Sequence, residues 1–112
     1  MTIVKICGLR TADHALAALH AGADFLGFIM APSRRQIAPA ELQAISAAVR
    51  AAPGGRQIGL VGVFVNETPA QMREIAQMCE LDVLQLSGDD GIAVLAELPP
   101  TLTVVKALRL TG

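Results

Sequence analysis

Short apolar runs that alternate with helical patterns constrain the fold of this chain more than any other feature. Five of these runs are predicted as strands: Ile3–Cys7, Asp24–Met30, Leu60–Val65, Val83–Leu86 and Thr103–Leu110. Their starts recur roughly every 20–35 residues, which is the size of a strand–helix unit. Continuously apolar strands between helices indicate a parallel sheet covered by helices. An open doubly wound sheet and a (β/α) barrel both fit, and periodicity alone does not choose between them.

Each predicted helix begins at a residue that suits a first turn, either a capping oxygen or a proline. The four predicted starts, in chain order, are Thr11, Pro39, Thr68-Pro69 and Asp89 or Asp90. Apolar residues follow at helical spacing, such as Leu42, Ile45 and Val49 in the second helix. Gly22 and Gly54-Gly55 stop the first two helices. Strands and helices are therefore expected to alternate along the whole chain.

Composition excludes several classes of protein. Apolar residues make up 53% of the 112 residues and mean hydropathy is +0.51, which is ample for a core and high for a complete small domain. The net charge is −1, and Trp and Tyr are absent, so nucleic-acid binding has little support. No apolar stretch reaches the roughly 20 residues of a membrane helix, and the first residues lack the pattern of a signal peptide.

The two cysteines, Cys7 and Cys79, do not form a disulfide framework or a zinc-binding pattern. This usage favours a reducing, cytoplasmic setting. Cys79 falls on the apolar stripe of the third helix and is expected in the core. His14 and His20 lie off the best apolar positions of the first helix and are expected at the surface.

Polar side chains follow every predicted strand. The segments concerned are Cys7-Gly8-Leu9-Arg10, Ala31–Arg35, Asn66-Glu67, Ser87–Asp90 and Arg109–Gly112. In parallel α/β proteins, ligands bind at the carboxyl ends of the strands and in the loops that follow them. An active site is therefore expected at this end of the sheet. Arg34 and Arg35 are either solvated loop charges or a pair suited to an anionic ligand.

The two-residue period of a strand sharpens this expectation. Lys5 and Cys7 point to one side of the first strand, and Gln85 and Ser87 share a side of the fourth. Lys106 lies inside the fifth, where a charge is costly unless it is paired or hydrated. In a barrel these polar groups are expected to converge near the mouth, where an ammonium favours the thiolate form of Cys7. A small buried thiol beside a Lys that reaches solvent is the alternative.

Five strings together resemble the phosphoribosylanthranilate isomerase family. They are Val4–Thr11 (with Lys-Ile-Cys-Gly), Gly22–Phe28 followed by Ala31–Arg35, Val61–Asn66, Leu81–Asp89 and Val105–Leu108. Each is weak alone, but five in series are specific, and they span essentially the whole chain. The resemblance implies an α/β fold of the (β/α)8 TIM-barrel family. Here it is expected as a single incomplete domain over residues 1–112, a partial barrel of five parallel strands and four helices.

The resemblance also implies a reaction, an Amadori rearrangement in tryptophan biosynthesis that needs no metal or organic cofactor. N-(5-phosphoribosyl)anthranilate becomes 1-(2-carboxyphenylamino)-1-deoxyribulose 5-phosphate. A general acid opens the ribose ring to a Schiff base, and a general base removes the C2 proton. The family's base corresponds to Cys7, and its carboxylate-binding Arg corresponds to Arg35, whose planar fork suits that group. The substrate is further expected to contact Arg34, Lys5, Gln85 and Ser87.

Three departures from the family pattern stand out. The loop from Ala31 to Gln36 is one residue shorter than common versions, which shifts Arg35 or makes Arg34 the contact. Ser87 stands where many members have His, and a hydroxyl keeps only part of its hydrogen bonding. The chain also stops after the fifth strand, before the family's general-acid Asp and its phosphate-binding loops.

Five strands do not close an eight-stranded barrel, so exposed strand edges are expected. The chain is therefore expected to self-associate, to need a complementing C-terminal half, or to aggregate. Three other readings stay open. One is a non-catalytic half-barrel assembly module. Another is a different (β/α)-barrel phosphosugar isomerase, although those mostly use carboxylates where this chain has Cys7-Gly8. The last is a flavodoxin-like regulatory domain, whose acidic cluster after the first strand is absent.

Overall fold

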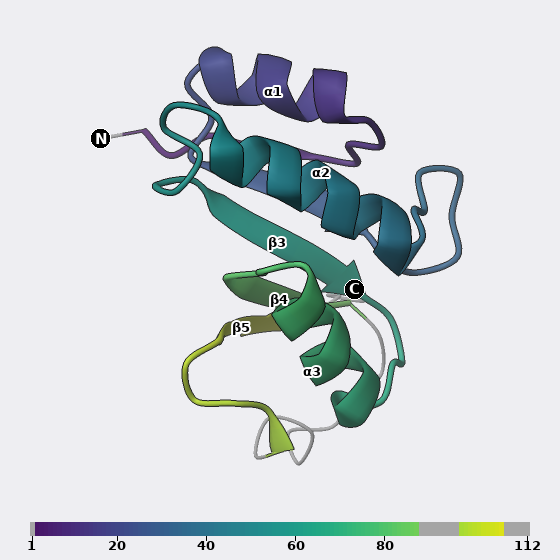
Figure 1. The fold of residues 1–112 in the computed structure, drawn as a ribbon. Helices are drawn as coiled ribbons and strands as arrows, with labels where there is room; N and C mark the ends of the chain where they lie inside the picture. The colour runs from purple at the N-terminus through teal and green to yellow at the C-terminus, as the bar shows by residue number, and fades with distance from the viewer. Residues whose placement is uncertain (1, 88–96, 107–112) are drawn as a thin grey trace, which may run out of the picture.

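The computed structural model of the chain describes residues 2–87 and 97–106. Its elements are β1 (Lys5–Cys7), α1 (Ala12–His20), β2 (Phe25–Ile29), α2 (Pro39–Ala51), β3 (Gly59–Phe64), α3 (Pro69–Met78), β4 (Val83–Leu86) and β5 (Thr103–Lys106) (Figure 1). The five predicted strands and first three predicted helices are confirmed, with small shifts at their ends. The predicted fourth helix, from Asp89 or Asp90, and the end of the fifth strand at Leu110 lie outside the described residues.

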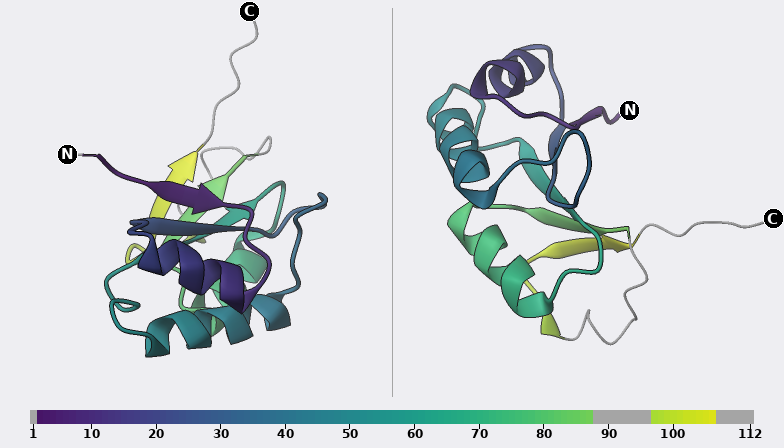
Figure 2. Two further views of the ribbon diagram at one scale, coloured as in Figure 1. Left: turned by 90° about the horizontal axis from the view of Figure 1, so that it is seen from above. Right: turned by 90° about the vertical axis from the view of Figure 1, so that its right-hand side faces the viewer.

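The five strands form one parallel sheet in the order β1-β2-β3-β4-β5. All three described helices lie on the same side of this twisted sheet, as both views in Figure 2 show. A doubly wound sheet reverses its strand order and carries helices on both faces. Sequential order with helices on one face is instead the wall of a (β/α) barrel. The doubly wound and flavodoxin-like alternatives are therefore wrong.

The core lies between the sheet and the helices. Alternate strand residues point into it and are almost fully buried: Leu26, Phe28, Leu60, Phe64, Leu84 and Leu86. The helices meet them with their own apolar stripes, which include Leu42, Val49 and Met72. Burying one such side chain contributes about 1.5–3 kcal/mol. This layer therefore holds the wall together and leaves the other face of the sheet available for a site.

The helix starts follow the capping chemistry predicted from the sequence. Thr11 Oγ1 accepts a hydrogen bond from His14 N at 3.1 Å, and Thr68 Oγ1 accepts one from Gln71 N at 3.2 Å. Each cap stabilises its helix by about 1 kcal/mol. The predicted surface position of His14 is confirmed, as is that of His20. No helix within the described ranges is long and apolar enough to cross a membrane.

Cys79 lies in the core, as predicted, at the end of α3. Its Sγ is 3.5 Å from the Pro39 carbonyl oxygen, and its own carbonyl accepts a hydrogen bond from Ser46 Oγ at 2.6 Å. Burial raises the pKa of the Cys79 thiol, because the apolar surroundings disfavour a thiolate. Cys79 is therefore a packing residue that ties α3 to α2.

Arg50, at the last turn of α2, connects three segments at the amino ends of the strands. It is only 9% exposed. Its guanidinium donates to the carbonyl oxygens of Gly55, Ile58 and Glu80 and to Asp82 Oδ2, at 2.7–3.0 Å. The same Asp82 oxygen accepts a hydrogen bond from Leu60 N at 2.8 Å. This arrangement satisfies buried carbonyls and fixes the loops that lead into β3 and β4.

Candidate active site

The face of the sheet opposite the helices carries the predicted base. Cys7 is the last residue of β1 and is aligned with Gly27 of β2, while Lys5 is aligned with Phe25. Since residues two apart in a strand share a face, Lys5 and Cys7 both point away from the helices. Cys7 is exposed. The prediction that these two side chains share one side is therefore confirmed, and the alternative of a buried thiol is wrong.

Lys5 crosses this inner face to reach β4. Its Nζ donates a hydrogen bond to Gln85 Oε1 at 2.5 Å, although two strands lie between β1 and β4. Gly27 makes room for the crossing, because a Cβ there would lie 2.8 Å from Cys7 Sγ and 3.2 Å from Lys5 Cε. The importance of Gly27 was missed in the sequence. A glycine inside an apolar strand signals the close approach of another group.

A concavity of about 270 Å³ lies over the same face. All the strands contribute to its lining, which is apolar except at Lys5, Gln85 and Thr103. Val105 of β5 contributes an apolar side chain that is 47% exposed. Cys7, Arg35 and Ser87 are not among the described residues that line this concavity, which includes the first residues of β1, β2, β4 and β5. Inward-facing side chains at these positions pack as a core in a closed (β/α) barrel.

The loop after β2 brings the Arg35 side chain against the segment that follows Cys7. Arg35 lies over Gly8, the residue after Cys7, and its Nη1 is 3.4 Å from the Gly8 carbonyl oxygen. A Cβ on Gly8 would lie 2.7 Å from Arg35 Cδ, and φ of Gly8 is +83°. Arg34 is held differently, since its carbonyl oxygen accepts a hydrogen bond from Arg10 Nη1 at 2.9 Å. Arg35 is thus the arginine whose side chain contacts the segment that bears the thiol.

The remaining predicted site residues have different outcomes. Ser87 follows β4 directly, is exposed, and donates its backbone N–H to the Phe64 carbonyl oxygen at 2.9 Å. Lys106 is aligned with Leu86, which is buried against the helices. The expectation that Lys106 converges with Lys5 is therefore wrong, because one step along a strand changes the face to which a side chain points. Val105 takes the inner position beside Gln85.

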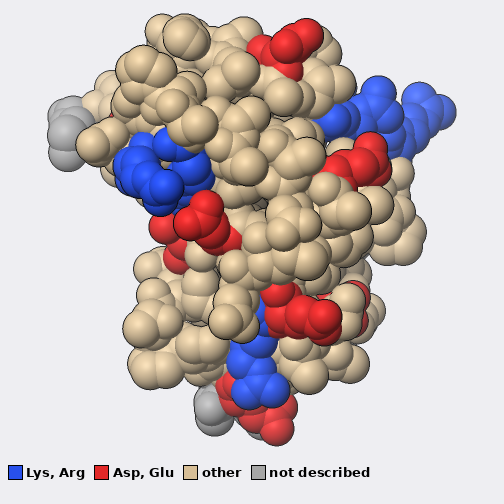
Figure 3. All heavy atoms as spheres, viewed as in Figure 1, with Lys and Arg blue, Asp and Glu red and all other residues tan. Residues whose placement is uncertain are grey.

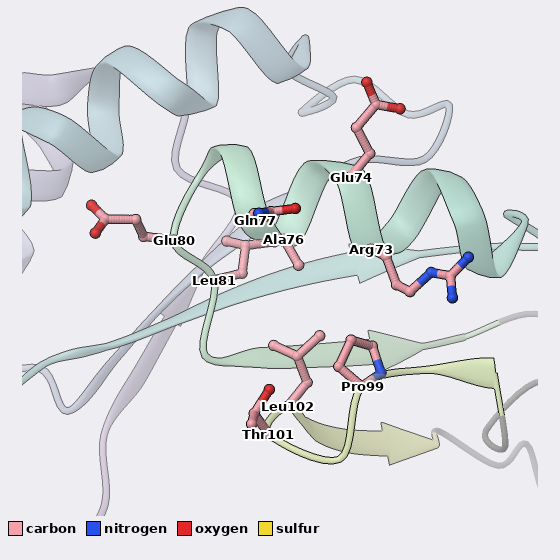
Figure 4. Close-up of a pocket in the computed structure, with 9 residues that line it drawn as sticks. All are labelled: Arg73, Glu74, Ala76, Gln77, Glu80, Leu81, Pro99, Thr101 and Leu102. Carbon is pink, nitrogen blue, oxygen red and sulfur yellow. The ribbon is translucent and has the colours of Figure 1, made fainter.

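A larger groove, about 610 Å³, lies outside this face, between α3 and the segment before β5 (Figure 4). Figure 4 shows Leu81, Pro99 and Leu102 around it, with Arg73 near one end. Arg73 Nη1 donates to the Glu97 carbonyl oxygen at 3.2 Å. The groove contains no thiol, so it is not the candidate active site. On the helix side of the molecule, acidic and basic side chains are interspersed and form no single basic patch (Figure 3).

Comparisons with known proteins agree with this fold. Residues 4–112 match the family described as N-(5'phosphoribosyl)anthranilate (PRA) isomerase. The N-(5'-phosphoribosyl)anthranilate isomerase of Roseiflexus sp. strain RS-1 is 53% identical over 111 residues, which is 97% of this chain and 52% of that protein. The chain thus spans about half the length of the curated relatives it matches.

Two crystal structures are similar over nearly all of the chain. One is phosphoribosyl anthranilate isomerase in complex with reduced 1-(o-carboxyphenylamino)-1-deoxyribulose 5-phosphate, with a TM-score of 0.89 and 34% identity over 100% of this chain and 56% of that one. The other is phosphoribosyl anthranilate isomerase from Thermus thermophilus, with a TM-score of 0.86 and 36% identity over 99% of this chain and 54% of that one.

Proposed function

This chain belongs to the N-(5'-phosphoribosyl)anthranilate isomerase family, and from that premise we propose that it carries the base-bearing part of the isomerase active site. The reaction is the Amadori rearrangement of N-(5'-phosphoribosyl)anthranilate in tryptophan biosynthesis. The observation that carries the proposal is the exposed Cys7 thiol at the carboxyl end of β1, with the Arg35 side chain folded over the next residue. A base and an anion-binding group thus meet at one edge of the sheet.

Cys7 acts as the general base in this proposal. Once the ribose ring has opened to a Schiff base, the thiolate takes the proton from C2. The C2–H electron pair becomes the C1–C2 double bond of an enolamine as the π pair of the C–N double bond moves to the nitrogen. The enolamine then becomes the ketone when the C2 hydroxyl loses its proton and C1 gains one. A base needs an exposed atom within hydrogen-bond reach of the proton that it removes. The exposure of Cys7 and its place at a strand's carboxyl end support this role.

Arg35 binds the anthranilate carboxylate in this proposal. A guanidinium presents parallel donors that match the two oxygens of a carboxylate. Its contact with the Gly8 carbonyl oxygen is long, at 3.4 Å, so a carboxylate competes for the same donor at little cost. The ligand of the solved relative also contains a carboxyphenyl group. Arg34 is the less favoured candidate, because its described contact is made by its backbone carbonyl.

Lys5, Gln85 and Ser87 complete the substrate-binding surface. Lys5 and Gln85 form a polar bridge on the inner face, on the side of β1 to which Cys7 also points, and their polar groups are available to substrate hydroxyl groups. Ser87 offers a hydroxyl at the carboxyl end of β4. We expect the general acid and the phosphate-binding loops from strands that follow the fifth in the family's barrel.

We further propose that a second protein surface covers the inner face, supplied by a complementing C-terminal half or by another copy of this chain. The exposed Val105 and the apolar concavity support this partner. Sedimentation equilibrium of the purified chain tests for self-association. A stable monomer that unfolds cooperatively argues against a second copy as the partner. If its stability and turnover also stay the same when strands six to eight of a relative are added, a complementing half is excluded as well.

The activity test adds the purified chain to phosphoribosylanthranilate made in place, and follows the loss of anthranilate fluorescence. The chain is assayed alone and with a fragment that carries strands six to eight of a relative. Turnover that falls roughly 100-fold or more in Cys7→Ser supports the base role. Cys79→Ala is the matched control, since it removes a thiol that lies in the core.

Two outcomes would count against the proposal. Turnover that survives in Cys7→Ser assigns the base to another group. A folded chain that gives no turnover, even with the complementing fragment, favours the non-catalytic assembly module instead. The fold of each variant is checked by circular dichroism, because the chain has no Trp or Tyr to report by fluorescence.

A further inference from the structure

We infer that Arg10 is a positioning residue of this site, which holds the loop that presents Arg35. The inference rests on the proposed function of Arg35 as the carboxylate-binding group. Arg10 lies in the loop after β1, and its Nη1 donates to the carbonyl oxygen of Arg34 at 2.9 Å. Twenty-four residues separate the two in sequence, so the bond joins two different loops.

The connection between the loops is reciprocal. Arg10 reaches from the first loop to the backbone of the second, while Arg35 reaches from the second loop to the Gly8 carbonyl of the first. Neither loop can shift along the sheet edge without disturbing both contacts. The pair of contacts therefore fixes the separation between the Arg35 side chain and Cys7, which precedes Gly8.

Arg10 provides the firmer of the two contacts. The Arg10 bond is 2.9 Å long, whereas the Arg35 bond is 3.4 Å long and near the limit of a hydrogen bond. Arg10 also stands next to Thr11, the N-cap of α1, so its backbone is anchored to a helix. Through the Arg10 guanidinium, the more exposed second loop is therefore held at a defined distance from α1.

The second loop has few supports of its own. Ser33 Oγ accepts from Arg35 N at 3.2 Å, and Ser33 O accepts from Gln36 N at 3.3 Å, but both bonds lie within the loop. The loop is tied to the sheet at its two ends, where Met30 N donates to the Val63 carbonyl oxygen at 2.9 Å and Ile37 N donates to the Ile29 carbonyl oxygen at 3.1 Å. Between these two ends, a long contact of 3.5 Å joins Gln36 Nε2 to the Met30 carbonyl oxygen, and the described contacts with the first loop are those of Arg10 with Arg34 and of Arg35 with Gly8. We infer that the Arg10 contact decides where Arg35 stands.

Hydrogen exchange tests the inference without requiring activity. We compare Arg10→Met, Arg10→Lys and the unchanged chain, and follow the amides of Arg35, Gln36 and Ile37 at low pH. Loss of one hydrogen bond between the loops is expected to speed exchange there roughly three- to tenfold in Arg10→Met. Exchange within α1 stays the same. Arg10→Lys, which keeps a donor but loses the fork, falls between the two.

Arg56→Met is the matched control for charge. Arg56 is exposed, and its described ion pair, with Glu80 at 3.8 Å, belongs to the amino ends of the strands. Removing this cation is expected to leave exchange in the second loop unchanged. Unchanged exchange of the three loop amides in Arg10→Met overturns the inference, whatever the activity of the chain.

A kinetic arm separates this inference from the proposed function. In a preparation with turnover, Arg10→Met is expected to raise KM roughly tenfold and change kcat by less than about twofold, because binding of the carboxylate is weakened. Arg10→Lys is expected to raise KM by less than Arg10→Met does. Normal KM in Arg10→Met overturns the positioning role. Absence of turnover in every preparation counts against the proposed function instead, and the exchange result then decides on Arg10.

Discussion

At the amino ends of the strands, Arg50 is buried and its guanidinium donates hydrogen bonds to four acceptors. At the carboxyl ends, Arg10 and Arg35 are exposed, and each guanidinium has one described hydrogen bond. Asp82 belongs to the amino ends as well, where it accepts from Arg50 and from Leu60 N. The Cys7 thiol at the opposite end is exposed.

This difference shows that the residues that stabilise the fold and the candidate catalytic residues lie at opposite ends of the same sheet. Buried charged groups persist when every acceptor and donor around them is matched, as around Arg50. A binding group must instead keep donors that a ligand can claim, so its contacts in the free protein are few and weak. Changes at the amino ends should therefore alter the free energy of unfolding, and changes at the carboxyl ends should alter reactivity.

The largest expected effect on stability is that of Arg50→Met. The change removes the guanidinium donor from three backbone carbonyls and from the Asp82 carboxylate, which keeps its bond from Leu60 N, and it is expected to lower the free energy of unfolding by about 3 kcal/mol. The cost stays at that level because Asp82 is 50% exposed and can be hydrated. Urea unfolding followed by circular dichroism gives the value. The rate at which iodoacetamide alkylates Cys7 is expected to stay unchanged.

Arg56→Met serves as the control for Arg50→Met, because Arg56 is 70% exposed at the same end of the sheet. Its loss is expected to change the free energy of unfolding by less than about 0.5 kcal/mol. Equal losses for the two variants would show that net charge, rather than the buried bonds, stabilises the amino ends.

Gly27→Ala tests a position between the two ends of the strands, on the inner face. It is expected to change both the free energy of unfolding and the reactivity of Cys7. The added Cβ meets Cys7 Sγ at 2.8 Å and Lys5 Cε at 3.2 Å, so one of these side chains must move. Because both side chains are exposed and can move, the cost is expected at the low end for overpacking, about 1 kcal/mol. Unfolding in urea and the alkylation rate of Cys7 are measured together, and both are expected to change.

A double-mutant cycle identifies the side chain that is crowded. If Cys7 Sγ is responsible, Cys7→Ala reduces the cost of Gly27→Ala, and the two effects are not additive. Strict additivity would contradict the close contact between residues 7 and 27.

The smallest expected effect concerns the pH dependence contributed by Cys79. Burial raises the pKa of its thiol above the ordinary value of 9.0. The folded state therefore binds this proton more tightly than the unfolded state, so the contribution to stability is complete below pH 9.0 and is lost as pH rises through the folded pKa. The expected loss is no more than about 1.4 kcal/mol per pH unit, and Cys79→Ala should remove it. An unfolding midpoint with the same alkaline slope in both proteins would contradict this assignment.

Local patterns in the sequence predict much of the fold. Caps at Thr11 and Thr68 are short-range features, and so is the shared face of Lys5 and Cys7. Each depends on residues within one turn or one strand, where propensity and spacing are informative. The order of the strands and the side on which the helices lie are not local, which explains why periodicity left two architectures open.

The contacts that build the site are longer in range and were not predictable from spacing. Lys5 meets Gln85 across 80 residues, and Arg10 meets Arg34 across 24. Arg50 follows Val49 at the end of a helix, a place where exposed basic residues are common, so its burial could not be foreseen. The prediction that Lys106 points to the inner face was wrong, because the sequence pattern of the fifth strand did not determine which of its residues face the barrel interior.

The strictly sequential strand order has a consequence for synthesis. Each strand after the first pairs with the one made just before it, so a growing chain can add strands at one edge as they leave the ribosome. The bond between Lys5 and Gln85 is an exception, since it waits until β4 has joined the sheet. We therefore expect nascent chains released before residue 83 to hold β1–β3 in register while the Lys5 ammonium remains in water. Protease resistance that arises only after β4 has been synthesised would contradict this order of assembly.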